Sequence, residues 1–211
     1  MKRHLLFDFD GTLVDSAPAI LSCFSRVLHA HGLQARCSID ANLVGPPLRQ
    51  TLAVLSGSDD VALLDALSAT FKQLYDADAC LETTAYAGCQ TLLEQLHAQG
   101  YSLSIATNKR LLPAQRILAA LGWQNLFSAV FASDSYPERY KDKTGMIAAL
   151  LEDTGVSAQS AIYIGDTVAD GRAAAANEVE FWPVAWGYGE FASEEQPLPS
   201  PHHLLERLGR A

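Results

Sequence analysis

Two aspartates, Asp8 and Asp10, follow a short apolar run near the start of the chain and precede Gly11 and Thr12. An apolar run that stops at turn-forming residues predicts a buried strand ending in a loop. Carboxylates at the end of a buried strand are costly unless they are paired or bind a metal ion. One carboxylate can act as a nucleophile and a second can transfer protons, while a glycine lets the backbone approach a ligand closely. The pattern therefore favours a metal site or a reaction centre over an ordinary Asp-Gly turn.

Residues 5–16 (LLFDFDGTLVDS) resemble motif I of the haloacid dehalogenase-like superfamily, whose members are largely Mg²⁺-dependent phosphatases. The resemblance implies that Asp8 is the nucleophile that attacks phosphorus and that Asp10 is the general acid and base. It also implies substrate contacts from Gly11 and Thr12. A covalent aspartyl-phosphate would split one difficult displacement into two easier steps.

Residues 104–109 (SIATNK) fit motif II of the same family, a Thr or Ser at the end of the second core strand. The resemblance implies that the hydroxyl of Thr107 binds the transferring phosphoryl group and that Asn108 is a further substrate contact. A threonine at a strand end is often structural, so this assignment depends on the order in which the motifs occur.

Residues 165–170 (GDTVAD) fit motif IV, and their two aspartates share one face of a first helical turn. The resemblance implies that Mg²⁺ is held by the carboxylates of Asp8 and Asp166 and the backbone carbonyl of Asp10. Few protein oxygens, completed by water and phosphate, are the usual Mg²⁺ arrangement. Asp170 is expected behind these ligands, where it orients water or the motif III lysine. The structural alternative is that an acidic residue merely suits the dipole of a helix N-terminus.

Motif III of the family is a lysine that offsets the charge between nucleophile and phosphate, and two lysines compete for this assignment. Many relatives have Lys followed by Pro, and Lys141 stands where that form predicts, but Asp142 follows it. Lys143, four residues before the apolar Ile147, fits a second form of the motif. We favour Lys143, and the other lysine is expected to be a solvated surface charge.

The elements that must position these residues alternate along most of the chain. Strand-like runs occupy residues 3–9, 101–106, 127–132, 160–164 and 180–185, and helical patterns occupy residues 88–99, 113–121, 144–154 and 168–177. This order predicts an α/β fold with a doubly wound parallel sheet, Rossmann-like in its topology. Ligands bind such sheets at the carboxyl ends of strands, where Asp8, Thr107 and Asp166 are expected to meet. Pro183 predicts that the last strand is short or lies at an edge.

The interval from 16 to 82 breaks this rhythm, because it is rich in Ala, Leu and Ser and shows helical candidates at 17–31, 48–56 and 59–76. A helical insertion directly after motif I corresponds to the C1 cap of the family. We therefore expect a catalytic core from residues 1–15 and 83–211 and a helical cap from residues 16–82. The alternative is an ordinary helical subdomain with no gating role.

Two loops resemble those of phosphoglycolate-phosphatase-like members of the family. Residues 44–49 (VGPPLR) resemble their substrate loop, which implies substrate contacts from Gly45, Pro46 and Arg49. A plain interhelix turn and an exposed arginine at a helix start are the structural alternatives. Residues 185–190 (AWGYGE) resemble a loop beyond the last core strand, and their glycines predict a bent segment near the rim of the site.

Composition limits the partners and the compartment. The chain has 211 residues, of which 49% are apolar, and its net charge of −9 argues against nucleic acid as a partner. The four cysteines lack metal or redox spacing, the first apolar run is too short for a signal peptide, and no run reaches membrane-spanning length. We expect a cytoplasmic monomer or homodimer with no membrane partner, and residues 193–201 as the most flexible segment.

These features together predict a Mg²⁺-dependent phosphatase that acts on a small phosphorylated metabolite, with phosphoglycolate the leading candidate. A 5'-nucleotidase, a pyrophosphatase and a sugar phosphomutase remain alternatives, since the cap selects the substrate. A haloacid dehalogenase does not use the second aspartate, and a phosphonatase needs a cap lysine that residues 16–71 lack. A non-catalytic module that binds a phosphorylated metabolite is least favoured, because the catalytic residue types are all present.

Overall fold

The computed structural model describes residues 4–191 and 196–210. The chain divides into two compact units, one formed by Met1–Asp15 with Ala85–Ala211 and the other by Ser16–Thr84. The second boundary falls two residues after the one expected from the sequence. Each unit is described by itself below.

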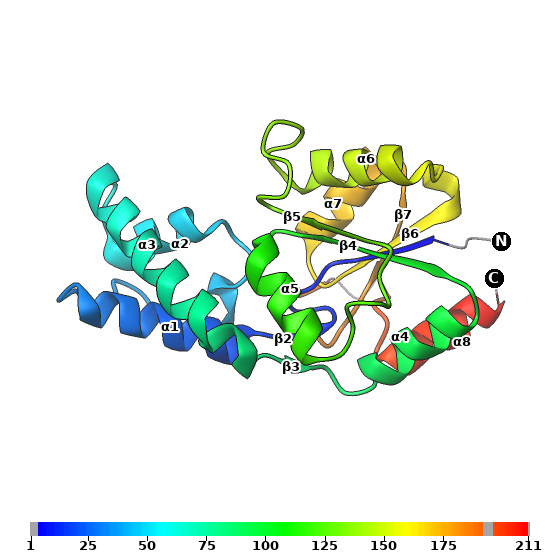
Figure 1. Ribbon diagram of the computed structural model, residues 1–211, viewed down its shortest axis with the longest axis horizontal. Coiled ribbons are helices and arrows are strands. Elements are labelled where there is room, and N and C mark those ends of the chain that lie inside the picture. The colour runs from blue at the N-terminus through cyan, green and yellow to red at the C-terminus, as the bar shows by residue number, and fades with distance from the viewer. Residues whose placement is uncertain (1–3, 192–195, 211) are drawn as a thin grey trace. The chain divides into compact units, whose positions relative to one another are not determined.

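The first unit is built on a five-stranded parallel sheet with the order β5-β4-β1-β6-β7 (Figure 1). Its strands are β1 (His4–Phe7), β4 (Ser102–Thr107), β5 (Ala129–Ala132), β6 (Ala161–Gly165) and β7 (Glu180–Pro183). The predicted α/β, doubly wound sheet is confirmed. β1 and β6 are buried along their whole length, as strands of a sheet covered on both faces must be.

The connecting helices cover both faces of the sheet. Helices α4 (Cys89–Ala98) and α5 (Leu111–Ala120) lie on one face with the C-terminal α8 (Pro201–Arg210), and α6 (Lys143–Thr154) and α7 (Val168–Ala176) cover the other (Figure 1). Parallel crossovers are right-handed, so reversing the direction of strand addition after β5 moves the following helices to the opposite face. That reversal makes β1 the switch point, next to which ligands bind in open α/β sheets.

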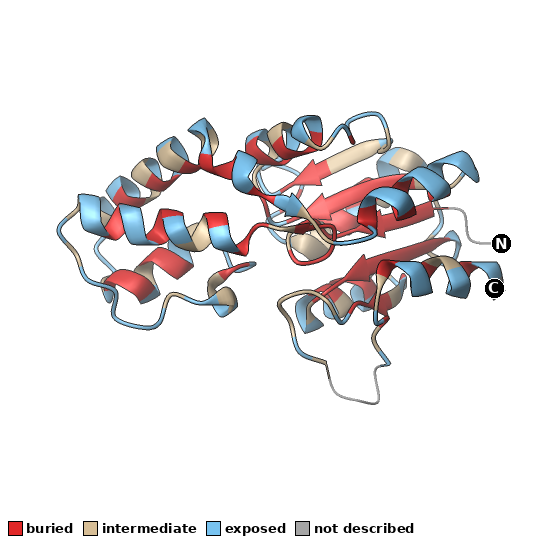
Figure 2. Cartoon of the chain, turned by 90° about the horizontal axis from the view of Figure 1, so that it is seen from below, coloured by how far each residue is buried: buried red, intermediate tan, exposed pale blue. Residues whose placement is uncertain are grey.

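One part of the core of this unit lies where α6 and α7 pack on the sheet. Leu6, Phe131, Ile147 and Tyr163 belong to one buried cluster there, contributed by strands β1, β5 and β6 and by helix α6. Figure 2 shows the same pattern, with buried strands between helices that are buried on one side and exposed on the other. This packing holds the carboxyl ends of the central strands at fixed positions.

Two short strands and one α-helix of the described residues were not predicted from the sequence. β2 (Val14–Asp15) and β3 (Thr84–Ala85) pair as a two-stranded ribbon where the chain passes between the two units. Helix α8 begins with Pro201, a residue favoured in the first turn, and buries Leu204 and Leu208, spaced four residues apart. Two-residue strands carry too little periodicity to be recognised alone, whereas α8 is as long as α4 and α5, and its Leu204–Leu208 spacing was a usable signal.

The segment expected to be flexible is only partly described. Residues 193–195 lie outside the described residues. Beyond them, Leu198 is buried and bridges to Val184, and its amide donates to the carbonyl of Pro183. Pro183 ends β7 at the edge of the sheet, as predicted from its inability to donate a ladder hydrogen bond.

The second unit is helical, as the sequence predicts. It contains α1 (Ala17–Ala30), α2 (Leu48–Ser56) and α3 (Val61–Ala77), with short 3₁₀ turns at Ala41–Leu43 and Ala79–Glu82. The side chain of Asp60 caps α3 by accepting from the amide of Leu63 at 2.7 Å. Phe24 of α1 packs on Phe71 of α3 with ring centroids 4.9 Å apart, which joins the two longest helices. Among the described residues, no helix has the length and apolarity needed to cross a membrane.

Candidate active site

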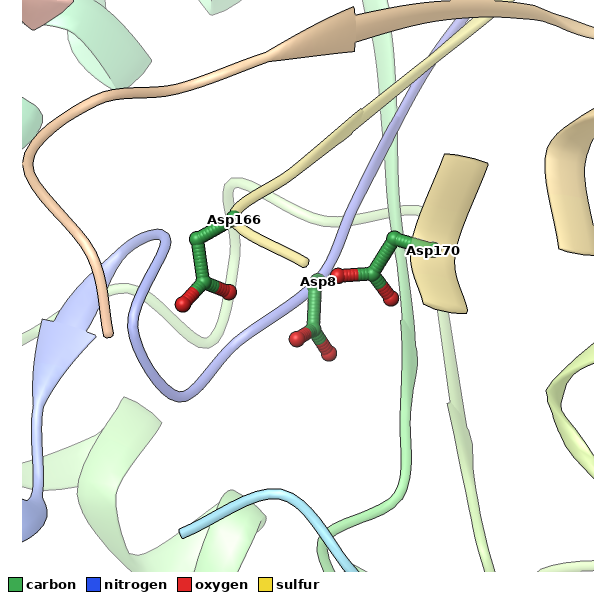
Figure 3. Close-up of side chains that lie close together, drawn as sticks. All are labelled: Asp8, Asp166 and Asp170. Atoms are coloured by element: carbon green, nitrogen blue, oxygen red, sulfur yellow. The ribbon is translucent and has the colours of Figure 1, made fainter. Parts of the chain in front are cut away.

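Three aspartates gather at the carboxyl ends of the central strands. Asp8 directly follows β1, Asp166 directly follows β6, and Asp170 lies in the first turn of α7. One carboxylate oxygen from each lies within 4.8 Å of the other two, and Figure 3 shows their carboxylates turned toward a common space. The sequence predicted this meeting for Asp8 and Asp166, because adjacent parallel strands end at the same edge of a sheet.

The Asp8 carboxyl group is buried and poorly satisfied. Its amide donates to the carbonyl of Ile164 at 2.9 Å, which continues the pairing of β1 with β6 beyond Phe7. Its Oδ1 lies 3.0 Å from Lys143 Nζ but accepts no hydrogen bond of good geometry from the described residues. Burial raises the pKa of Asp8 to about 8; Lys143 opposes this shift, and the Asp170 and Asp166 carboxylates add to it.

Asp166 is held from two sides. Thr12 Oγ1 donates to its Oδ1 at 3.2 Å, and the amide of Tyr188 donates to its Oδ2 at 2.8 Å. Burial raises the pKa of Asp166, although these hydrogen bonds favour its ionised form. A Cβ on Gly11 would lie 2.2 Å from Asp166 Oδ2, so the motif I loop can pass this carboxylate only with glycine at that position.

The loop that supplies Tyr188 was expected at the rim of the site, and it lies directly against Asp166. A Cβ on Gly187 would lie 2.3 Å from Asp166 Cβ, and a Cβ on Gly189 would lie 2.0 Å from the Asp166 carbonyl oxygen. Trp186 Nε1 donates to the Thr12 carbonyl at 2.9 Å, which fixes the loop to motif I. The two glycines therefore allow a close main-chain approach that any side chain would block.

Asp170 is fully buried and uses its two oxygens differently. Oδ2 accepts from the amide and hydroxyl of Thr167 at 3.1 and 2.7 Å, which completes a capping box at the start of α7. Oδ1 accepts from Lys143 Nζ. Asp170 therefore both begins the helix and orients the lysine.

The structure distinguishes the two candidate lysines of motif III. Lys143 is the first residue of α6, and its ammonium group lies between Asp8 and Asp170. Burial alone would lower the pKa of Lys143, but the Asp170 and Asp8 carboxylates raise it well above its usual value. Lys141 is exposed. Asp142 separates the two lysines as the helix N-cap, accepting from the amide of Gly145 at 2.9 Å.

The predicted motif II residues lie at the end of β4, beside β1. Thr107 is buried and its Oγ1 accepts from the amide of Lys109 at 3.1 Å, whereas Asn108 is exposed. Lys109 was missed by the sequence analysis. Its Nζ lies 2.9 and 3.2 Å from the two oxygens of Asp10, so the side chain of Asp10 points to this lysine and is not part of the three-aspartate cluster. The only signal in the sequence was a lysine two residues after the strand-ending threonine.

The remaining predicted substrate contacts lie in the helical unit. Gly45 has a positive φ of 106° and is exposed, as is the following Pro46. Arg49, in the first turn of α2, is also exposed and forms an ion pair with Asp65 of α3. Its guanidinium donates in addition to the Val61 carbonyl at 3.3 Å. These three residues belong to a different compact unit from the aspartates.

The residues of the cluster fit a divalent cation of the magnesium type. Asp8, Asp166, Asp170 and Lys143 carry a surplus of two negative charges when all are ionised, in a site where burial disfavours charge. Asp8 Oδ1 faces the Lys143 ammonium at 3.0 Å without a hydrogen bond of good geometry, so this buried acceptor can still take a ligand. All the donors are oxygens, which suit Mg²⁺ better than softer metals.

Comparisons with known proteins agree with this geometry. A sequence profile described as "Haloacid dehalogenase-like hydrolase" matches residues 5–184. A protein named phosphoglycolate phosphatase from Xanthomonas campestris pv. campestris is 34% identical over 189 residues, covering 88% of this chain and 84% of its own. One of the same name from Xylella fastidiosa is 32% identical over 216 residues, covering 97% and 92%. A haloacid dehalogenase-like hydrolase from Streptococcus pneumoniae superposes with a TM-score of 0.86 at 26% identity, covering 98% of each chain.

Proposed function

Because the chain belongs to the haloacid dehalogenase-like hydrolases, we propose that it is a Mg²⁺-dependent phosphatase that hydrolyses a small phosphate monoester through an aspartyl-phosphate. The observation that supports this most directly is the buried Asp8 carboxylate, whose Oδ1 lies 3.0 Å from the Lys143 ammonium without accepting a hydrogen bond of good geometry. A nucleophile with an available oxygen and a neighbouring cation suits attack on an anionic phosphoryl group.

In the first step, an Asp8 oxygen forms a bond to phosphorus while the bond from phosphorus to the leaving oxygen breaks. Asp10 gives its proton to that oxygen, so an alcohol rather than an alkoxide departs. The Thr107 hydroxyl and the Lys143 ammonium interact with the phosphoryl oxygens, which carry the negative charge of the transition state. Gly11 and Thr12, which lie against Asp166, and the exposed Asn108 are the further proposed contacts of the substrate.

In the second step, water attacks the phosphorus of the aspartyl-phosphate and transfers a proton to Asp10. The bond between Asp8 and phosphorus breaks, which regenerates the carboxylate and releases inorganic phosphate. Asp10 thus ends the cycle in the protonation state in which it began. The reaction involves no change of oxidation state, and its co-reactant is water.

Asp8, Asp166 and the backbone carbonyl of Asp10 are the proposed Mg²⁺ ligands, and the bound ion supplies positive charge for the nucleophile and the phosphoryl oxygens. Asp170 holds Lys143 beside these ligands through the hydrogen bond described above. Thr12 and the amide of Tyr188 orient Asp166. Such outer contacts fix the direction of ligand side chains and commonly change metal affinity when lost.

Phosphoglycolate is the proposed substrate among small monoesters. The support is the name shared by the curated relatives and the loop of residues 44–49, in which Gly45, Pro46 and Arg49 are the proposed contacts. We further propose that the enzyme works in the cytoplasm, which its four free cysteines support.

Phosphate release from a panel of esters tests the proposal. The panel contains phosphoglycolate, nucleoside monophosphates, sugar phosphates and pyrophosphate, each assayed with Mg²⁺ and with chelator for wild type and Asp8→Asn. We expect Mg²⁺-dependent release that the variant loses by at least about 10³-fold, because the nucleophile is removed. Turnover that survives in Asp8→Asn would exclude the mechanism, and isomerised sugar phosphate without free phosphate would identify a mutase.

A further inference from the structure

Lys109 and Asp10 form an ion pair that joins two loops separated by 99 residues of sequence. Lys109 Nζ lies 2.9 Å from Asp10 Oδ1 and 3.2 Å from Oδ2, so the ammonium contacts both oxygens. The side chains are 4% and 13% exposed, respectively. A pair this enclosed differs from a surface salt bridge, whose partners are free to separate into water.

The main chain on each side of the pair is also held. The amide of Lys109 donates to Thr107 Oγ1 at 3.1 Å, and the Lys109 carbonyl accepts from the amide of Ser133 at 3.0 Å. Asp10 forms a β-bridge with Val14 within the motif I loop. The backbone of Lys109 is therefore fixed to the ends of β4 and β5. Its side chain contacts Asp10, whose own loop is held by a backbone bridge.

A buried ammonium group requires a partner, because removing a charge from water costs several kcal/mol. Lys109 satisfies this requirement with Asp10, and the enclosure removes the freedom that a lysine side chain has at the surface. The same contact gives the Asp10 carboxyl group a fixed direction, and one oxygen can keep the lysine contact while the other carries the transferred proton. A group that transfers protons in both steps must lie within hydrogen-bonding reach of the leaving oxygen and later of water.

We propose that Lys109 is a positioning residue that holds the Asp10 carboxylate in the direction required for proton transfer. The inference rests on the proposed phosphatase function and adds a residue to it. Lys143 is the lysine at the nucleophile, since it lies 3.0 Å from Asp8, whereas the ammonium of Lys109 contacts the proton-transfer group. The two lysines thus serve different halves of the chemistry.

The leaving group provides the test. An alkyl ester must receive the Asp10 proton as its phosphorus–oxygen bond breaks, since an alkoxide is a poor leaving group. An aryl ester such as p-nitrophenyl phosphate releases a stable phenolate and needs no proton. The value of kcat/KM reports the steps up to formation of the aspartyl-phosphate, so the ratio of kcat/KM between the two esters measures the contribution of the acid.

Lys109→Met removes the charge with little change in side-chain length. We expect kcat/KM for the fastest alkyl ester of the panel to fall by about 10²-fold, as for a misplaced catalytic group, and that for p-nitrophenyl phosphate to fall less than about 5-fold. In an Asp10→Asn background, Lys109→Met should change the aryl-ester rate by less than about 2-fold, because residues that act through one another are not additive. Lys72→Met, which removes an exposed lysine, is the matched control and should leave the ratio unchanged.

Other outcomes overturn the inference. Equal losses for both esters with weaker inhibition by inorganic phosphate would make Lys109 a phosphate ligand, and a lower Tm with an unchanged ratio would make it structural. If Lys109→Met does not fold, Lys109→Arg, which keeps the charge but moves the donor, takes its place in the same ratio. A wild type that releases no phosphate from either ester contradicts the proposed function itself, whereas an active variant with an unchanged ratio contradicts only the role of Lys109.

Discussion

The carboxyl group of Asp8 illustrates how burial and charge oppose each other at the scale of a single residue. Burial raises its pKa to about 8, and the ammonium of Lys143 offsets only part of this effect. Two further carboxylates share the same space. The folded protein therefore holds the nucleophile at a cost in electrostatic free energy. A bound divalent cation would offset that cost.

This conflict predicts how stability depends on pH without metal. Because the pKa of Asp8 is about 8 in the folded chain, above its ordinary value of 3.8, the folded state binds the proton more tightly than the unfolded state. The free energy of unfolding should then fall as pH rises from 3.8 to about 8. In chelator at pH 8, Asp8→Asn should raise Tm by several degrees, since roughly 1 kcal/mol corresponds to about 2–4 °C at this size.

Thermal unfolding of both proteins at pH 5 and pH 8, with and without Mg²⁺, measures this effect. The advantage of the variant should be smaller at pH 5, and Mg²⁺ should raise Tm more for the wild type than for Asp8→Asn. Equal Tm values for the two proteins at pH 8 in chelator would show that the buried Asp8 carboxylate does not lower the free energy of unfolding.

The two lysines near the start of α6 provide a second prediction at this scale. Lys143→Met should lower kcat/KM by about 10²–10³-fold, because it removes a preorganised positive charge facing the phosphoryl group. Lys141→Met changes the same kind of charge two residues away at an exposed position, and its kcat/KM should stay within about 2-fold of wild type. Steady-state kinetics on one ester compares the variants, and a larger loss for Lys141→Met would reverse the assignment.

At the scale of elements, the loop of residues 185–190 joins three separate parts of the site. Trp186 Nε1 donates to the Thr12 carbonyl, the amide of Tyr188 donates to Asp166, and the Tyr188 hydroxyl donates to Asp15 Oδ1 at 2.9 Å. The loop therefore connects the carboxylate after β6 with the motif I loop and with β2. Its glycines permit this because the main chain passes where side chains do not fit.

Gly189→Ala tests the importance of this close approach. The added Cβ would lie 2.0 Å from the Asp166 carbonyl oxygen, so the loop must shift. We expect an apparent Mg²⁺ affinity lowered by about 10–100-fold, as for other changes behind a metal ligand, measured from the Mg²⁺ dependence of turnover. Gly209→Ala is the control, since no heavy atom lies within 4 Å of the position that its Cβ would take on α8. Equal Mg²⁺ affinities in the two variants would contradict the role of the loop.

At the scale of the whole molecule, the first unit contains a complete sheet with helices on both faces, and the helical unit is one continuous insertion. The chain passes between the units through β2 and β3, which pair with each other. The two ends of the insertion are therefore close together. We therefore expect that the insertion can be removed without opening the core of the unit that holds the aspartates.

Replacing residues 16–84 by a short Gly-Ser linker should leave the remaining unit folded. We expect a cooperative thermal transition and a circular dichroism spectrum of mixed helix and strand, because the sheet keeps its own buried core. Thermal unfolding followed by circular dichroism measures this, with the full chain as the reference. A spectrum without a cooperative transition would show that the helical unit is required for the core to fold.

The sequence by itself determined the fold class and the chemical types at the site. Apolar runs ending in Asp8, Thr107 and Asp166 predicted parallel strands whose ends meet, because strand periodicity and strand-end polarity are local properties. The helical insertion was likewise predicted from its composition and from the spacing of its apolar residues. The short strands β2 and β3 were missed because two residues carry little periodic signal, and helix α8 was missed although it is as long as α4 and α5.

Tertiary structure alone decided the pairings. The ion pair of Lys109 with Asp10 and the passage of Gly189 over Asp166 join residues far apart in the chain. So does the contact of Lys143 with Asp8, a lysine that the motif spacing had only favoured over Lys141. No local pattern specifies such contacts, because they depend on how the strands are ordered and where each loop turns. Side-chain direction and burial, which set charge balance and proton transfer here, become definite only when the sheet has formed and the loops have packed over its edge.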